Sequence, residues 1–151
     1  MSGISCFGEL KGQDEALGML RQYLKSSRMP SGLIFCGPEG VGKKTAAVLT
    51  AKALNCLPAA NEPCGQCASC LKIEKGQHPD VHLIDNDQDA VKSDDIRALR
   101  REIFLKPYEG KKRVFIIDNA HKLTAEAANS ILKVLEEPPE GSIIILVTAC
   151  P

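Results

Sequence analysis

Four short apolar runs divide the chain, and each has the length of a buried β-strand. They cover residues 33–36, 81–84, 114–117 and 142–148. Between them, apolar residues recur every three or four positions, which is the spacing of an amphipathic helix; these stretches are 10–24, 46–55, 93–104 and 123–137. The strands carry almost no polar residues, and strands alternate with helices. We therefore expect a three-layer α/β domain with a parallel sheet, in which the run 142–148 is central.

Two of the predicted helices have recognisable caps and inward faces. In the helix 93–104, Ser93 is the expected cap and the buried positions are Ile96, Leu99 and Ile103. In the helix that follows Leu123, Thr124 is the expected cap and two prolines end the helix. Its expected buried residues are Ala127 or Ala128, Ile131, Leu132 and Leu135. Arg97, Arg100 and Arg101 are either a solvated face or a basic contact for a partner.

A glycine-rich segment connects the first strand to the helix that follows it. Its order, strand, turn and helix N-terminus, is that of a loop whose backbone N–H groups surround phosphate oxygens. The candidate nucleotide-binding residues are Gly37, Pro38, Gly40, Val41, Gly42, Lys43, Lys44 and Thr45. The pattern G-x-x-x-x-G-K is met, with Lys43 placed to reach the β- and γ-phosphates. The other interpretation is a glycine turn that only joins the strand to the helix.

Two positions depart from the pattern of an ATP-hydrolysing site. A hydroxyl that binds Mg²⁺ should follow the lysine, but Lys44 stands there and Thr45 comes one residue late. Asp118 closes the strand 114–117, where it would hold Mg²⁺ through water. The next residue should be a glutamate that polarises the attacking water, and here it is Asn119, a poor general base. The sequence therefore predicts a loop that keeps the phosphate-binding conformation but has lost the residue that binds Mg²⁺. It does not decide whether the loop still binds ATP or ADP.

Four of the seven cysteines fall within one short stretch. Cys56, Cys64, Cys67 and Cys70 have the spacing C-x7-C-x2-C-x2-C, which suits tetrahedral Zn²⁺. Four sulfurs leave no open coordination position, so we expect a structural zinc in a knuckle without secondary structure. Plain core packing and a redox-active cysteine pair are the alternatives. His78 and His82 are expected to be surface or turn residues, and Cys36 to be a buried, slowly reacting thiol.

Composition narrows the range of functions. The chain has 151 residues, 19 basic and 19 acidic, so no overall charge attracts nucleic acid or an anionic membrane. No apolar run approaches the roughly 20 residues of a membrane span, and no signal-peptide profile is present. We therefore expect a cytoplasmic protein of one domain, which makes no contact with a membrane.

Taken together, these residues resemble the first domain of bacterial clamp-loader subunits, an AAA+ module with a zinc knuckle inserted after its phosphate-loop helix. The resemblance rests on the loop 37–45, the four cysteines, and the segments 12–14, 78–80, 106–110, 117–118 and 132–139. It implies one AAA+ domain over residues 1–151, with the knuckle at about 56–70. It also implies lid and collar domains beyond residue 151, and a polar sensor residue at Thr148 or, in the register we favour, a lost one at Ala149.

Among those subunits, the altered loop and acidic pair are similar to the delta-prime type and not to the motor type, gamma/tau. The resemblance implies a non-hydrolysing structural subunit of the DNA polymerase III clamp loader, which helps load the sliding clamp onto primed DNA. Its implied partners are the gamma/tau and delta subunits, with the clamp and DNA met through the assembled complex. The alternatives are an active clamp-loader ATPase of the gamma/tau type and a zinc-dependent nucleic-acid-binding module.

Overall fold

The computed structural model describes residues 14–25, 30–37, 42–56, 63–84 and 93–149, and the structural statements below concern this part of the chain. Along the chain the elements are α1 (Asp14–Lys25), β1 (Gly32–Cys36), α2 (Lys43–Asn55), α3 (Ala68–Glu74), β2 (Val81–Ile84), α4 (Ser93–Glu102), β3 (Arg113–Ile117), the short 3-10 helix η2 (Ala120–Lys122), α5 (Ala125–Glu136) and β4 (Ser142–Thr148).

The four strands form one parallel sheet in the order β1-β4-β3-β2. Phe35 of β1 pairs with Val147 of β4, and Ile145 of β4 pairs with Ile116 of β3. β4 therefore lies inside the sheet, as its apolar sequence predicts. Because all strands run the same way, the residues that follow β1, β3 and β4 come together at one edge of the sheet.

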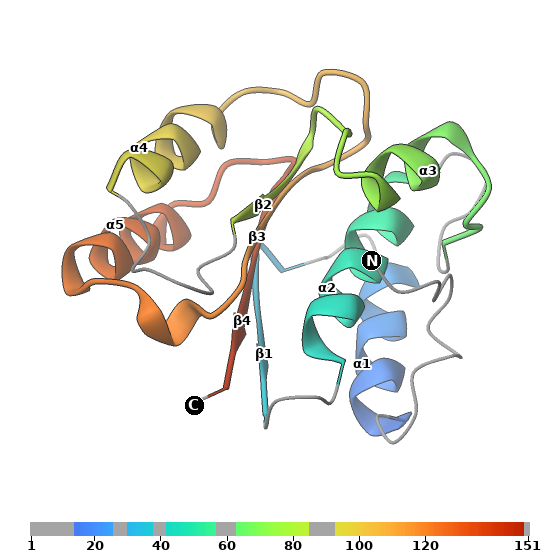
Figure 1. Cartoon of the computed structure of the whole chain (residues 1–151), viewed down its shortest axis with the longest axis horizontal. Coiled ribbons are helices and arrows are strands. Elements are labelled where there is room, and N and C mark those ends of the chain that lie inside the picture. The colour runs from blue at the N-terminus through green and yellow to red at the C-terminus, as the bar shows by residue number, and fades with distance from the viewer. Residues whose placement is uncertain (1–13, 26–29, 38–41, 57–62, 85–92, 150–151) are drawn as a thin grey trace.

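Helices cover both faces of the sheet, so the expected three-layer arrangement is confirmed. Figure 1 shows α1, α2 and α3 on one side of the sheet and α4 and α5 on the other. Successive side chains of β3 point to opposite faces. Val114 and Ile116 pack with residues of α2 and α3, whereas Phe115 and Ile117 pack with residues of α4 and α5.

α4 and α5 each differ from the sequence prediction in one detail. α4 ends at Glu102 and not at residue 104, although Ile96, Leu99 and Ile103 are all buried as expected. In α5, Leu132 is 55% exposed and Val134 is buried in its place. A helix turns about 100° per residue, so the face that carries Ile131 returns at Val134 and turns away from Leu132.

Candidate functional site

The candidate nucleotide site lies at the carboxyl edge of the sheet, between β1 and α2. β1 ends at Cys36, and α2 begins at Lys43 after Gly42, which has a φ of 86°. This left-handed conformation is readily adopted only by glycine, which explains why the sequence has glycine there. Thr45 lies half-buried in the first turn of α2. Pro38, Gly40 and Val41 of the predicted loop lie outside the described residues.

Lys43, the expected phosphate-binding lysine, points back toward the sheet. Its Nζ donates hydrogen bonds to two backbone carbonyls, that of Gly37 after β1 and that of Thr148 at the end of β4, the latter at 2.9 Å. The ammonium thus connects the ends of two neighbouring strands. A phosphate that bound Lys43 in the expected way would have to compete with these two carbonyl oxygens.

Lys44 and Asp118, which the sequence placed in separate motifs, are brought together. The Nζ of Lys44 lies 3.8 Å from Oδ2 of Asp118. The other carboxylate oxygen, Oδ1, accepts the backbone N–H of Asn119 at 2.9 Å. Asn119 itself has a φ of 54° and a ψ of 46°, a left-handed conformation that asparagine adopts more readily than most side chains. The residue at the expected glutamate position therefore also has a conformational role.

His121 is a site residue that the sequence analysis did not single out. Its Nδ1 accepts the backbone N–H of Ala149 at 3.3 Å and lies 3.3 Å from Oγ1 of Thr148. Thr148 is buried at the end of β4, so it is the polar side chain at that strand end, whereas Ala149 contributes only its backbone. The sensor role of either position stays a prediction. The sequence offered only the position of His121, three residues after Asp118.

The four clustered cysteines meet on the side of the molecule that carries α2 and α3. Cys56 directly follows α2, Cys67 caps α3, and Cys70 lies in the first turn of α3. Their sulfur atoms all lie within 4.8 Å of one another, and the sulfurs of Cys64 and Cys70 are 4.0 Å apart. Four sulfurs at tetrahedral corners around zinc, each about 2.3 Å from it, would be separated by about 3.8 Å. The donor set fits zinc.

Backbone N–H groups surround these sulfurs. Cys64 Sγ accepts from the N–H of Gln66 at 3.4 Å and from that of Cys67 at 3.2 Å, and Cys56 Sγ accepts from the N–H of Cys64 at 3.4 Å. The N–H groups of Gln66 and Cys67 lower the pKa of the Cys64 thiol, whereas burial raises the pKa of Cys70 to about 12. A metal that binds thiolates must therefore displace the proton of Cys70, so metal affinity should rise with pH.

Two sequence predictions around the cysteines were wrong, those for the knuckle and for Cys36. The knuckle is not free of secondary structure, because α3 starts at Ala68, between Cys67 and Cys70. His78 lies in a turn as expected but is buried, with Nε2 3.1 Å from the Ser69 hydroxyl and Nδ1 accepting the N–H of Asp80. Cys36 is exposed, because the helices on its face of the sheet do not cover the end of β1.

A buried polar network fixes the segment 108–112 against the base of the knuckle. The Asp80 carboxylate is fully buried and accepts the backbone N–H groups of Tyr108 at 2.6 Å, Glu109 at 2.8 Å and Gly110 at 2.6 Å. Asn55, the last residue of α2, accepts those of Lys111 and Lys112 with its Oδ1. The Nζ of Lys111 reaches the carbonyl of Cys56 at 2.7 Å. The same network thus also holds the backbone of Cys56, the first of the four clustered cysteines.

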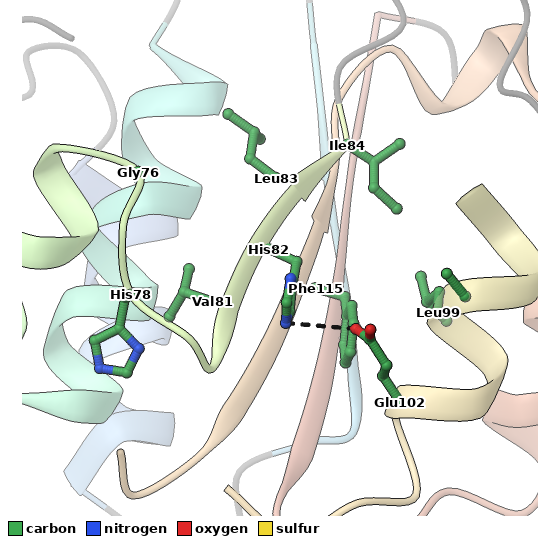
Figure 2. Close-up of a pocket in the computed structure, with 10 residues that line it drawn as sticks. Gly76, His78, Val81, His82, Leu83, Ile84, Leu99, Glu102 and Phe115 are labelled. Atoms are coloured by element: carbon green, nitrogen blue, oxygen red, sulfur yellow. Dashed lines mark ion pairs between the residues drawn. The ribbon is translucent and has the colours of Figure 1, made fainter. Parts of the chain in front are cut away.

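A pocket of about 390 Å³ lies between β2 and α4, apart from the candidate nucleotide site and from the four cysteines. Figure 2 shows His82 and Glu102 facing one another there, with Nε2 and Oε2 3.6 Å apart, and the His82 ring stacked on Phe115 at 5.0 Å. None of the predicted site residues lines this pocket.

No helix in the described part of the chain is long and apolar enough to cross a bilayer.

The sequence of this chain is similar to those of DNA polymerase III subunits. Residues 12–151 match the family described as "DNA polymerase III, delta subunit". The chain is 39% identical over 139 residues to DNA polymerase III subunit delta' of Bacillus subtilis, covering 92% of this chain and 42% of the relative. It is also 40% identical over 147 residues to DNA polymerase III subunit tau of the same organism, covering 96% of this chain and 26% of the relative.

A solved structure supports the fold. The chain matches the crystal structure of a DNA polymerase III gamma subunit-related protein from Thermotoga maritima with a TM-score of 0.55 and 21% identity. The match covers 88% of this chain and 39% of that one. At this identity the likeness concerns the fold alone. The chain spans less than half the length of each of these relatives.

Proposed function

The chain belongs to the DNA polymerase III delta-subunit family, and from this membership we propose that it forms the AAA+ domain of a clamp-loader subunit of the delta-prime type. In this role the domain is a structural member of the complex and does not hydrolyse ATP. Its partners are the gamma/tau and delta subunits, and through the assembled complex it helps load the sliding clamp onto primed DNA.

The observation that carries the non-hydrolysing role is the ion pair between Lys44 and Asp118. A hydrolytic site of this fold needs a metal near the phosphates and a carboxylate that polarises water. Here a lysine stands where the metal-binding hydroxyl is expected, and it is paired with the acidic residue. Asn119 offers no general base. Loss of a positioned base alone lowers a rate by about 10² to 10⁴.

The four cysteines have a structural role in this proposal. Zn²⁺ held by Cys56, Cys64, Cys67 and Cys70 would join the end of α2 to the start of α3. Because all four positions are filled by sulfur, the metal cannot bind a substrate or activate water. The knuckle thereby stabilises the face of the domain that α1, α2 and α3 form.

The second candidate function is an active ATPase of the gamma/tau type. It is favoured by the 40% identity to the tau subunit of Bacillus subtilis, which is close to the 39% identity to its delta' subunit. The two candidates share the fold and the family, and they differ in turnover.

The test is a measurement of phosphate release by the full chain with ATP, in Mg²⁺ and in EDTA. A purified gamma/tau subunit is the positive control. We expect release at background with the full chain and Mg²⁺-dependent release with gamma/tau. If the chain hydrolyses ATP with Mg²⁺, and Lys43→Ala abolishes the activity, the gamma/tau-type function is correct.

A further inference from the structure

Asp118 is the acidic residue expected from the sequence to hold a divalent metal through water, and in the structure a side-chain cation lies beside it. Lys44 Nζ is 3.8 Å from Asp118 Oδ2. The Lys44 side chain is 40% exposed and that of Asp118 is 14% exposed, so the carboxylate is largely withdrawn from water while the ammonium remains partly hydrated. The other carboxylate oxygen accepts the Asn119 N–H. The two oxygens of Asp118 therefore face different partners, the Asn119 N–H at Oδ1 and the Lys44 ammonium, at ion-pair distance, at Oδ2.

The distance between Lys44 Nζ and Asp118 Oδ2 is close to that expected between a carboxylate oxygen and a metal bound through water. Mg²⁺ binds oxygen at 2.0–2.1 Å, and a bound water then donates a hydrogen bond of about 2.7 Å to a carboxylate. A metal held through water would therefore lie about 4 Å from the carboxylate oxygen. The ammonium of Lys44 lies at this distance from Oδ2. It comes from the residue whose hydroxyl should have been a metal ligand, so the residues present do not fit Mg²⁺.

We propose that Lys44 is a permanent replacement for the divalent cation, which excludes metals from Asp118 and makes the carboxyl edge of the sheet independent of Mg²⁺. This inference rests on the proposed function and deepens it by specifying which ion the site holds. A dication that approached Asp118 would meet a tethered positive charge at short range. To bind, it would have to displace Lys44 from the carboxylate, and the ligand that should help it is missing.

The first experiment uses Mn²⁺ as a paramagnetic probe of divalent-metal binding, followed by electron paramagnetic resonance on the zinc-loaded full chain. Titrations are done with Mn²⁺ alone and with ADP present, because ADP supplies additional oxygen ligands. The variants are Lys44→Thr, Asp118→Asn and the double variant, with Lys44→Ser as a second hydroxyl replacement. Lys133→Thr, which removes the same charge from the exposed face of α5, is the matched control.

The expected result is that the wild type and Asp118→Asn bind the same amount of Mn²⁺, as does Lys133→Thr. Lys44→Thr and Lys44→Ser should gain one site in the ADP titration, with affinity at least ten-fold above the wild type, and the double variant should lose it. The inference is overturned if the wild type already has a site that Asp118→Asn removes. It is also overturned if neither hydroxyl variant gains one.

A second measurement tests the ion pair without any ligand. Urea unfolding at low ionic strength should show that Lys44→Thr and Asp118→Asn are not additive. For a half-exposed pair we expect a coupling of about two- to five-fold in the unfolding equilibrium constant, reduced by added salt. Strictly additive effects would show that the two side chains do not interact. Neither measurement uses turnover, so a chain that proves to hydrolyse ATP would refute the proposed function separately.

Discussion

Asn119 shows how one residue serves two requirements at the carboxyl edge. In the sequence Asn119 is notable only because it stands where a glutamate is expected. In the structure it has a φ of 54°, a backbone conformation that most residues with a side chain avoid. Its N–H also holds one oxygen of Asp118. A glutamate here would carry a backbone cost that asparagine largely avoids.

This cost can be measured by comparing Asn119→Gly with Asn119→Ala. Both variants remove the side chain, so their difference reports the backbone alone. We expect the glycine variant to be more stable by about 1 kcal/mol in the free energy of unfolding, measured in urea. Equal stability, or a more stable alanine variant, would mean that the left-handed conformation at residue 119 is wrong.

Asp80 provides a pH-dependent prediction. Burial by itself would raise its pKa, but the N–H groups of Tyr108, Gly110 and Glu109, together with Arg113, outweigh burial and hold the pKa below its ordinary value. A carboxylate whose folded pKa is depressed stabilises the fold above its unfolded pKa of about 3.9, and this contribution is lost as the pH falls through the folded pKa. The wild type should therefore lose stability steeply below about pH 4.

Asp80→Asn should be less stable than the wild type at pH 7 by about 3 kcal/mol, because three N–H groups and Arg113 lose their anion. The difference should shrink on acidification, as seen in melting temperatures between pH 7 and pH 3. Burial also lowers the pKa of His78, and its charging below about pH 6.5 destabilises both proteins, more so Asp80→Asn, because the Asp80 charge raises the pKa of His78. The shrinking difference is therefore read below about pH 4. A constant difference down to pH 3 would refute the role of the Asp80 charge.

Residue-scale features divide into those that a linear pattern can predict and those that it cannot. The predicted Thr124 cap is confirmed, since its hydroxyl accepts the N–H of Ala127. It could be predicted because helix capping depends on residues that are neighbours in sequence. The exposure of Cys36 could not be predicted, because it depends on how far the helices extend over the end of β1. The exposure of Leu132 follows instead from the helical period, which turns it away from Ile131 and Val134. The contact between Lys44 and Asp118 joins residues on different elements, and charge alone did not pair them.

At the scale of elements, α3 and the four cysteines depend on one another. α3 has only seven residues and is too short to be stable alone in water. It is held by Ile73, which packs against the sheet, and by the ion pair between Glu74 and the buried Lys52 of α2. Zinc would add a third link, from the end of α2 to the first turn of α3.

Cys70→Ser should therefore lose the zinc, whereas Cys36→Ser, which changes the exposed thiol at the end of β1, should retain one zinc per chain. Elemental analysis of the purified proteins measures this. The stability of Cys70→Ser should fall by about 3 kcal/mol or more, roughly 6–12 °C in Tm for a domain of this size. A fully metal-free wild type, or a Cys70→Ser chain that still holds zinc, would refute the site.

The sequence predicted strands more accurately than helix ends or the knuckle. All four strands were found within one residue of their predicted limits, because continuous apolar runs identify buried parallel strands. The start of α3 at Ala68 was missed, since the cysteine and proline pattern indicated a knuckle without secondary structure. The start of α3 depends on the cap that Cys67 supplies, and its sulfur accepts the N–H of Cys70 at 3.5 Å.

At the scale of the whole molecule, the parallel sheet gathers the ends of β1, β3 and β4 into one site. Class and layers could be predicted from alternating elements, but the strand order could not, because no local pattern encodes which strands pair. The order β1-β4-β3-β2 is what places Thr148 beside Lys43 and Asp118 beside Lys44. Two lysine side chains of α2 thus lie at this edge, Lys43 beside the end of β4 and Lys44 beside the end of β3.

Restoring both missing groups should not restore hydrolysis in this domain alone. We expect Lys44→Thr with Asn119→Glu to gain Mg²⁺-dependent affinity for ADP, measured by calorimetry, while phosphate release stays near background. A neighbouring subunit's arginine can contribute about 10³ to 10⁵ to phosphoryl transfer, and it is absent here. Turnover near 1 s⁻¹, an ordinary enzyme rate, would show that no partner is needed to complete the site.

The central claim, that this chain takes part in a clamp loader without hydrolysing ATP, is tested most directly in the reconstituted complex. ATP hydrolysis and clamp loading are measured with Lys43→Met in this chain and, separately, with the loop lysine of gamma/tau replaced, after gel filtration has verified assembly. We expect unchanged hydrolysis and loading with Lys43→Met, and loss of both with the gamma/tau variant. A clear fall in the rate of hydrolysis with Lys43→Met in an intact complex would contradict it.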